Sequence, residues 1–238
     1  MSCNRKIDSK RTVDFSPTCN FKHRSKKHAT IKRVLSLFAF LFVFPFLYGQ
    51  KKNTYTWEAS AFKGVDLSLS WASSIRIEPS QDQAITAIYQ SEGEYQEHLF
   101  LRSLSENTTL IITETTNPLV SGYNDKLSAH KVFASTLSLF LPQNLSLRVK
   151  AKSASMEVNG GFYEVSLFLE EGKLILNSPY MKGTVTTRSA DVEWHGLQQN
   201  FSAMSKFGDV IGAPVSQKDS PFIIESTWGN IAVYSLRN

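Results

Sequence analysis

The chain has 238 residues, of which 42% are hydrophobic, so it is long enough for a globular protein with a sizeable core. Its formal charge of +5 suggests anionic partners, but residues 1–49 hold 10 of the 26 Lys and Arg and only two acids, a net of +8. The remaining chain carries 16 basic and 19 acidic side chains, a net of −3, which removes the case for a nucleic-acid-binding protein.

Residues 1–49 have the layout of a secretion signal, with basic residues ahead of an apolar stretch from Val34 to Leu47. At about 1.5 Å per residue, this stretch would span about 21 Å as a helix, less than the roughly 30 Å of a bilayer core. Pro45 disfavours a continuous helix further. We therefore expect a signal peptide cleaved near Gly49 and an extracytoplasmic protein, with a retained signal anchor as the alternative.

Both cysteines, Cys3 and Cys19, lie in this leader. The mature chain is therefore expected to contain no disulfide and no thiol chemistry. Neither cysteine follows the apolar stretch, where the lipid-anchored cysteine of a bacterial lipoprotein would stand, so no lipid anchor is predicted.

From Thr54 onward, apolar residues alternate with polar ones in short runs, which is typical of β-strands. Runs of this kind cover residues 65–71, 75–77, 110–112, 137–141 and 145–149. The stretches Ser91 to His98 and Thr115 to His130 are polar and are expected to be loops. Residues 50–130 are thus predicted to form a β-rich N-terminal portion.

An internal repeat follows over residues 131–238. It is marked by a small residue at Ala154, Gly172, Ala190, Gly208 and Gly229, with spacings of 18, 18, 18 and 21. Apolar residues recur at fixed offsets from each, for example Val149, Leu167, Val185, Ala203 and Ile224 five positions before. A register held over five units is what stacked coils require. The sequence therefore predicts an all-β fold with a C-terminal β-solenoid of about 18 residues per coil; alternating strands of a β-sandwich are the alternative.

Corner chemistry agrees with this prediction, because each small residue is followed by a polar one that suits a tight turn. If the coils stack in chain order, Val192 lies next to Val210, and Asp191 lies above Asp209 on neighbouring coils. Such a column of acids offers oxygens to a divalent cation, but too few for calcium when Lys173 shares the column. Capping of the turns is the other interpretation of these side chains.

Three short strings carry a resemblance to a known family: Thr187-Arg188-Ser189-Ala190-Asp191-Val192, Ser205-Lys206-Phe207-Gly208-Asp209-Val210 and Glu225-Ser226-Thr227-Trp228-Gly229-Asn230-Ile231. They resemble the recurring Thr-x-Ser-Gly-Asp-Val/Ile element of the bacterial putative-adhesin family of exported β-solenoids. The resemblance covers roughly residues 130–238. It implies the fold and an extracytoplasmic location, and it supplies no catalytic residues.

Phe207 and Trp228 each stand just before the small residue of a corner. On adjacent coils they are predicted to stack where a glycan or another ligand could reach them. Stabilisation of neighbouring coils by the aromatic pair is the purely structural interpretation.

No catalytic, cofactor or metal site is predicted. His98, His130 and His195, the histidines of the mature chain, form no metal-spaced pair and lie in no nucleophile motif. Glu170 and Glu171 are adjacent, so on a strand their side chains are expected on opposite faces, unable to share a substrate.

The sequence therefore favours a non-enzymatic, exported, adhesin-like module that binds an unknown protein or glycan at the cell surface or in the periplasm. A polysaccharide lyase or hydrolase built on a β-helix is the alternative. The final strand, from Asn230 to Ser235, is expected to be an exposed end strand through which copies of the chain could associate.

Overall fold

A computed structural model describes residues 51–92, 98–117, 134–197, 200–212 and 220–235. Contacts divide the chain into two compact units, residues 1–49 and 50–238, and every described residue belongs to the second. The predicted leader and its cleavage point therefore lie outside the described residues. So does most of each predicted loop: 93–97 of the first and 118–130 of the second.

The described chain is all-β, as predicted, with one short 3-10 helix, η2 (Ala59–Ala61). The strands of the first half are β1 (Lys51–Glu58), β2 (Gly64–Leu69), β3 (Ala72–Pro79), β4 (Ala84–Glu92), β5 (Leu99–Glu106), β6 (Thr109–Thr116) and β7 (Ala134–Leu141). The strands of the second half are β8 (Ser146–Asn159), β9 (Glu164–Asn177), β10 (Gly183–Thr187), β11 (Asp191–Gly196), β12 (Ser202–Ser205), β13 (Val210–Ile211), β14 (Phe222–Ser226) and β15 (Ile231–Ser235).

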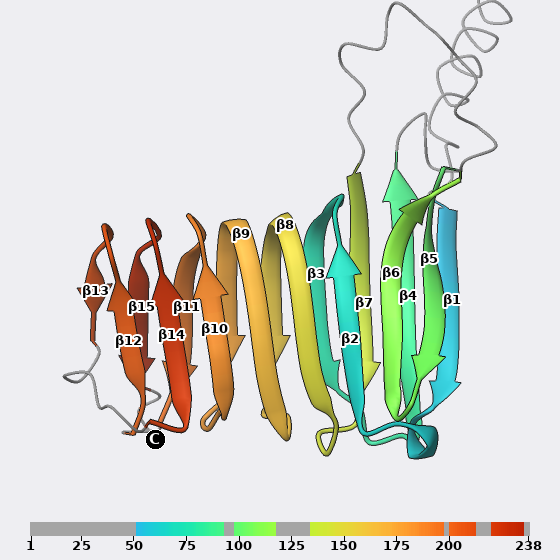
Figure 1. The fold of residues 1–238 in the computed structure, drawn as a ribbon, viewed down its shortest axis with the longest axis horizontal. Helices are drawn as coiled ribbons and strands as arrows, with labels where there is room; N and C mark the ends of the chain where they lie inside the picture. Colours follow the sequence, from blue (N-terminus) through green and yellow to red (C-terminus); the bar gives the residue numbers. More distant parts are fainter. Residues whose placement is uncertain (1–50, 93–97, 118–133, 198–199, 213–219, 236–238) are drawn as a thin grey trace, which may run out of the picture. The chain divides into compact units, whose positions relative to one another are not determined.

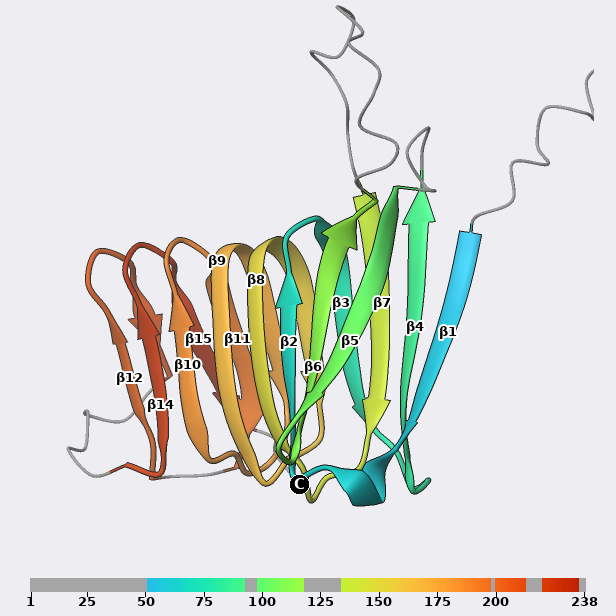
Figure 2. The same cartoon turned by 45° about the vertical axis from the view of Figure 1, so that its right-hand side comes forward.

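All fifteen described strands belong to one open sheet, which joins strands from both sides of the predicted boundary at residue 130. The long strands β8 and β9 bend over midway, so that each contributes to two facing layers (Figures 1 and 2). The first half of β8 pairs with β2, and its second half pairs with β3. Elsewhere two separate strands repeat this strand–corner–strand arrangement, in the pairs β2–β3, β6–β7, β10–β11, β12–β13 and β14–β15. The connection between β6 and β7 is longer than in the other pairs. We call each of these pairs, and β8 and β9 individually, a unit.

Neighbouring units pair in parallel, and the predicted columns of apolar residues are confirmed. Leu147 pairs with Val165 and Val165 with Gly183, both at an offset of 18 residues. In the second layer, Leu174 pairs with Val192 at the same offset. Side chains at these positions are buried between the two layers, because alternate residues of a strand point to opposite faces.

The order of the units differs from the prediction. The last unit, β14–β15, lies between β10–β11 and β12–β13: Val192 pairs with Ile231, and Ile231 pairs with Val210. Val192 and Val210 are thus in one column but are not neighbours. The predicted exposed end strand, now β15, is paired with β11 on one side and, at Ile231 and Ala232, with β13 on the other, and β12 and β13 lie at this end of the sheet instead (Figure 1).

The same change of order occurs at the other end, where β2–β3 lies between the later unit β6–β7 and β8. Three strands that pair in antiparallel fashion, β1, β4 and β5, complete this end. The β-rich N-terminal portion therefore shares the register of the repeat: Leu67 pairs with Val149, and Ile75 with Met156.

In one column of apolar residues a glycine leaves space, and a side chain from the opposite layer fills it. Gly183 stands where neighbouring units have Val165 and Phe222. The fully buried Trp194 packs edge-on against Phe201 and Phe222, at centroid distances of 4.7 and 5.0 Å. Its indole N–H donates to the backbone carbonyl of Ser178 at 3.0 Å, so the ring fills the core without leaving a buried polar atom unpaired.

In the described parts of the chain, no helix is long and apolar enough to cross a membrane.

Candidate functional site

The corners near the C-terminal end are held by hydroxyl side chains. Ser226 accepts a hydrogen bond from the backbone N–H of Gly229 at 2.9 Å, and Ser205 accepts one from Gly208 at 3.0 Å. The Ser205 hydroxyl also donates to the Gly229 carbonyl of the neighbouring unit at 2.8 Å. These bonds fix the four-residue turns 206–209 and 227–230 between the two strands of each unit and tie adjacent corners together.

Phe207 and Trp228 project from these corners and stack as predicted. Their ring centroids are 4.1 Å apart, and the ring planes differ by 19°. The two residues are 56% and 58% exposed, so the pair presents an open aromatic surface to solvent. Lys206 Nζ lies 5.0 Å from the Phe207 ring centroid and places a positive charge beside it.

Backbone hydrogen bonds hold this pair in place. Trp228 donates its N–H to the carbonyl of Arg188 at 2.7 Å, and Phe207 donates to Thr227 at 3.0 Å. Since each aromatic residue is anchored to the corner beside it, little conformational freedom of the backbone remains to be lost on binding a ligand.

The polar column beside the pair has a different order from the predicted one. Asn230 lies between Asp191 and Asp209: its N–H donates to Asp191 Oδ1 at 2.8 Å, and its Oδ1 accepts from the N–H of Asp209 at 2.9 Å. Asp191 and Asp209 are therefore not on neighbouring units. Each side chain caps the next corner, as the turn-capping interpretation has it. Within the described ranges, no three His, Cys, Asp or Glu side chains are grouped so that they could hold a metal ion.

The remaining candidates from the sequence are scattered. His195 stacks on Tyr234 at a centroid distance of 5.1 Å, on the outer face of the second layer. His98 precedes β5, where its carbonyl accepts a hydrogen bond from Asn117 at 2.8 Å, and His130 lies outside the described residues. The structure thus brings His98 and His195 into no common site.

The expectation that Glu170 and Glu171 point to opposite faces is wrong. Both carboxylates approach Arg188 on the neighbouring corner, with N–O distances of 3.1 and 2.6 Å. The reason is that the two glutamates lie where β9 bends from one layer to the other, so the alternation of a straight strand does not apply there. They form a partly exposed ion-pair cluster with the arginine.

Glu114 is a buried acid that the sequence analysis missed. Its Oε1 accepts hydrogen bonds from the Tyr89 hydroxyl at 2.6 Å and from Ser135 at 2.5 Å. Its Oε2 accepts from the backbone N–H groups of Ser70 and Trp71 at 2.8 and 2.7 Å. The signal was present in the sequence, since Leu110, Ile112 and Glu114 alternate and place the acid at an inward-facing position.

The position of Glu114 has a structural explanation. In regular corners, two N–H groups bind the carbonyls of the neighbouring corner, as Ser189 binds Glu170 at 2.8 Å. Ser70 and Trp71 are the equivalent donors of the β2–β3 corner, but here the carboxylate of Glu114 supplies the acceptors. Burial, together with the hydrogen bond to Glu114, raises the pKa of the Tyr89 hydroxyl above its ordinary value. The cluster therefore has a role in the fold and is closed to solvent.

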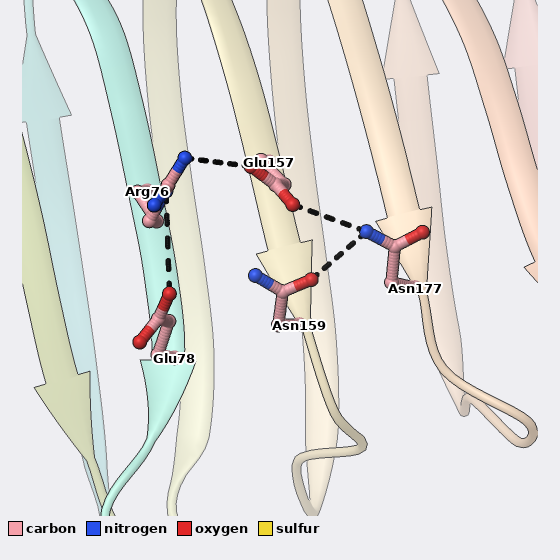
Figure 3. A network of polar contacts seen from close by, with 5 residues as sticks. All are labelled: Arg76, Glu78, Glu157, Asn159 and Asn177. Atoms are coloured by element: carbon pink, nitrogen blue, oxygen red, sulfur yellow. Dashed lines mark hydrogen bonds and ion pairs between the residues drawn. The ribbon is translucent and has the colours of Figure 1, made fainter.

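The outer face of the second layer carries a polar ladder across three adjacent units (Figure 3). Arg76 lies 3.4 Å from the carboxylate of Glu157 and 4.0 Å from that of Glu78. The amide of Asn177 donates to Glu157 at 3.2 Å and to Asn159 at 2.9 Å. These contacts lock neighbouring strands in register and leave a flat, polar surface.

A shallow hollow of about 460 Å³ crosses the outer face of the first layer at the starts of β2, β8, β9 and β10. An ion pair between Arg148 and Asp66, at 3.2 Å, lies in it. Lys63, Glu164, Ser166 and Thr184 also line it. Polar and apolar groups line the hollow in similar measure, and it contains neither Phe207 nor Trp228, the candidate ligand-contact residues from the sequence.

A scan against protein-family models and a search of curated proteins found no match. Among solved structures, the chain is similar to a putative cell adhesion protein from Clostridium sporogenes, with a TM-score of 0.53 and 12% sequence identity; 79% of this chain and 100% of that chain are covered. Putative adhesins from Bacteroides fragilis and Parabacteroides distasonis also match, with TM-scores of 0.31 and 0.24 and identities of 10% and 9%. They cover 79% and 77% of this chain and 98% and 97% of their own. The first of these similarities, the one with a TM-score above 0.5, confirms the predicted resemblance at the level of the fold.

Proposed function

We propose that this chain is an exported, non-enzymatic interaction module of the adhesin kind, built as a β-solenoid with coils of about 18 residues. The parallel pairing of units at offsets of 18 residues supports the solenoid. Similarity in fold to a solved protein named as a cell adhesion protein supports the functional class. The layout of residues 1–49 supports export, with cleavage near Gly49 and a location in the periplasm, at the cell surface or outside the cell.

One observation carries the proposal: the exposed, stacked pair of Phe207 and Trp228 on a rigid corner. Aromatic side chains are enriched where proteins bind partners, because they bury much area at a low cost in conformational entropy. The exposed aromatic pair, with Lys206 over the Phe207 ring and the acceptor side chain of Asp209 two residues further along the chain, suits a partner protein or a glycan. Arg188 forms ion pairs with both solvent-facing acids, Glu170 and Glu171, so each carboxylate already has a partner in the fold, which favours binding over acid–base catalysis.

A binding screen tests the proposal. The purified exported protein is applied to a glycan array and to immobilised extracellular matrix and bacterial surface proteins. We expect binding without turnover, and we expect the double variant Phe207→Ala/Trp228→Ala to weaken it at least tenfold, because truncation of a central aromatic pair typically costs about 2 kcal/mol or more of binding free energy.

Tyr180→Ala serves as the matched control, since Tyr180 is equally exposed but lies away from these corners. It should bind like the wild type. Unchanged binding by the double variant would remove the aromatic pair from the ligand site. Turnover of a bound polysaccharide, lost on substitution of one carboxylate, would instead establish an enzyme.

A further inference from the structure

The apolar core is open at the end of the sheet formed by β12 and β13. Val210 stands in the same column as Leu174, Val192 and Ile231, which are at most 1% exposed, yet Val210 itself is 39% exposed. The reason is its place in the outermost unit, where the column has a neighbour on one side. Among the described residues, no strand pairs with the outer edges of β12 and β13.

Large apolar side chains gather around this open end. Met204 on β12 is 57% exposed and Ile211 on β13 is 65% exposed, and Phe207 lies on the corner between them. Repeat proteins normally end in a unit with a polar outer surface, which keeps the last apolar layer from water. The described residues of the outermost unit provide no such surface.

The two edge strands here also carry no charged side chain, since β12 reads Ser-Ala-Met-Ser and β13 reads Val-Ile. At the opposite end, the edge strands are charged: β1 contains Lys52 and Glu58, and β5 contains Arg102 and Glu106. Charges on edge strands are a common protection against pairing with another chain. That protection is present at one end of the sheet and missing at the other.

We propose that the β12–β13 end packs against the same end of a second copy of this chain, which gives a closed two-fold dimer. The asymmetry of the two ends favours this partner, because the charged β1–β5 end disfavours head-to-tail chains while the uncharged end can pair with itself. The corner that joins β12 and β13 carries Lys206 and Asp209, one charge of each sign, so two copies can meet there without net repulsion. Pairing would continue both layers across the interface and cover Val210.

Formation of the dimer does not require the ligand of the proposed function, but Phe207 lies on the β12–β13 corner, so the interface would lie beside the aromatic pair of each copy. Two copies would carry two aromatic corners, so a multivalent surface ligand would be held by both at once.

The mass of the protein in solution tests the dimer. The full chain is expressed, purified in its exported form and measured by multi-angle light scattering from low to high micromolar concentration. We expect twice the mass of one chain for the wild type and the mass of one chain for Val210→Lys. The lysine can reach solvent from the open end of a monomer, whereas pairing would bury its charge.

Leu104→Lys is the control, because Leu104 is 53% exposed on the edge strand β5 at the opposite end, and this variant should remain a dimer. Circular dichroism verifies the fold of each variant, and if Val210→Lys does not fold, Met204→Lys takes its place. The mass of one chain for the wild type at every concentration, or a folded lysine variant that stays dimeric, would overturn the proposal. Loss of dimers with ligand binding intact would leave the proposed function standing.

Discussion

At the scale of single residues, the described core contains a buried hydrogen bond between the Tyr89 hydroxyl and the Glu114 carboxylate. The Tyr89 hydroxyl has no exposure to water and donates to the carboxylate at 2.6 Å. Ionisation of the phenol would place a second negative charge beside Glu114, away from solvent. Both effects hold the pKa of Tyr89 above its ordinary value near 10.

This raised pKa predicts a loss of stability at alkaline pH. The unfolded chain releases the tyrosine proton above pH 10, while the folded chain retains it, so stability is full below pH 10 and falls as the pH rises further. At pH 11 the wild type should lose about 1.4 kcal/mol of unfolding free energy through this one group. Urea unfolding at pH 8 and pH 11 measures the loss.

Tyr89→Phe should lack this part of the pH dependence, although it is less stable than the wild type at pH 8 because Glu114 loses a donor. Other groups titrate equally in both proteins, so the difference between their two pH slopes isolates Tyr89. Equal slopes would show that the phenol ionises as readily in the folded chain as in the unfolded one.

Predictions for single residues were confirmed where the repeat spacing alone determines which side chains become neighbours. Phe207 and Trp228 occupy one position of the repeat, and the structure places them on adjacent corners in a stack. Glu114 was missed because an acid in an apolar alternation gives no sign of its partners: Tyr89 and Ser135 come from two other strands, β4 and β7.

At the scale of elements, glycine marks the places where two units approach most closely. Gly183 has a φ of +120°, and a Cβ at this position would lie 1.9 Å from the backbone oxygen of Val165 on the neighbouring strand. Backbone atoms cannot yield as a flexible side chain can. The position therefore requires glycine for its conformation and for its space.

Gly183→Ala is expected to lower the free energy of unfolding by about 3 kcal/mol, since it adds backbone strain and pushes β10 away from β9. Chemical denaturation followed by tryptophan fluorescence would report it through the buried Trp194. Gly64→Ala is the matched control: its Cβ would lie 3.2 Å from the Ser146 carbonyl oxygen without a left-handed φ, and the cost should stay within about 1 kcal/mol. Similar values for the two variants would contradict this account.

The sequence predicted the elements of the second half well, because alternation and corner residues are local signals. It did not predict that β2–β3 and β6–β7 share the same columns, since a long polar segment separates β6 from β7 in the sequence. The alternation of a straight strand also failed for Glu170 and Glu171, where β9 bends.

At the scale of the whole molecule, the units follow an order that differs from that of the chain at both ends. The repeat positions in the sequence do not determine this order, because Val192 would have an equivalent apolar neighbour whether Val210 or Ile231 lay beside it. The spacing of 21 residues before the last small residue was a weak sign that the final unit is connected differently.

Engineered cysteines would report the order directly. In a background with Cys3 and Cys19 replaced by serine, the pair Asp191→Cys/Asn230→Cys should form a disulfide on mild oxidation, because these residues lie side by side on neighbouring corners. Asp191→Cys/Asp209→Cys should stay reduced, since two strand spacings of about 4.8 Å exceed the reach of a disulfide. Both outcomes are read by mass spectrometry, and the reverse pattern would restore stacking in chain order.

The position of the last unit, β14–β15, affects the order in which the chain can fold as it emerges N-terminus first from a ribosome or a membrane channel. Strands β12 and β13 leave such an exit before β14 and β15, yet the strands that pair with them in the described part of the chain are those later ones. Assembly at this tip must wait for the final residues. A chain truncated before residue 222 would lack β14 and β15, so β12 and β13 would have no strands to pair with. Quality-control proteases could recognise such a truncated chain by its unfolded C-terminal segment.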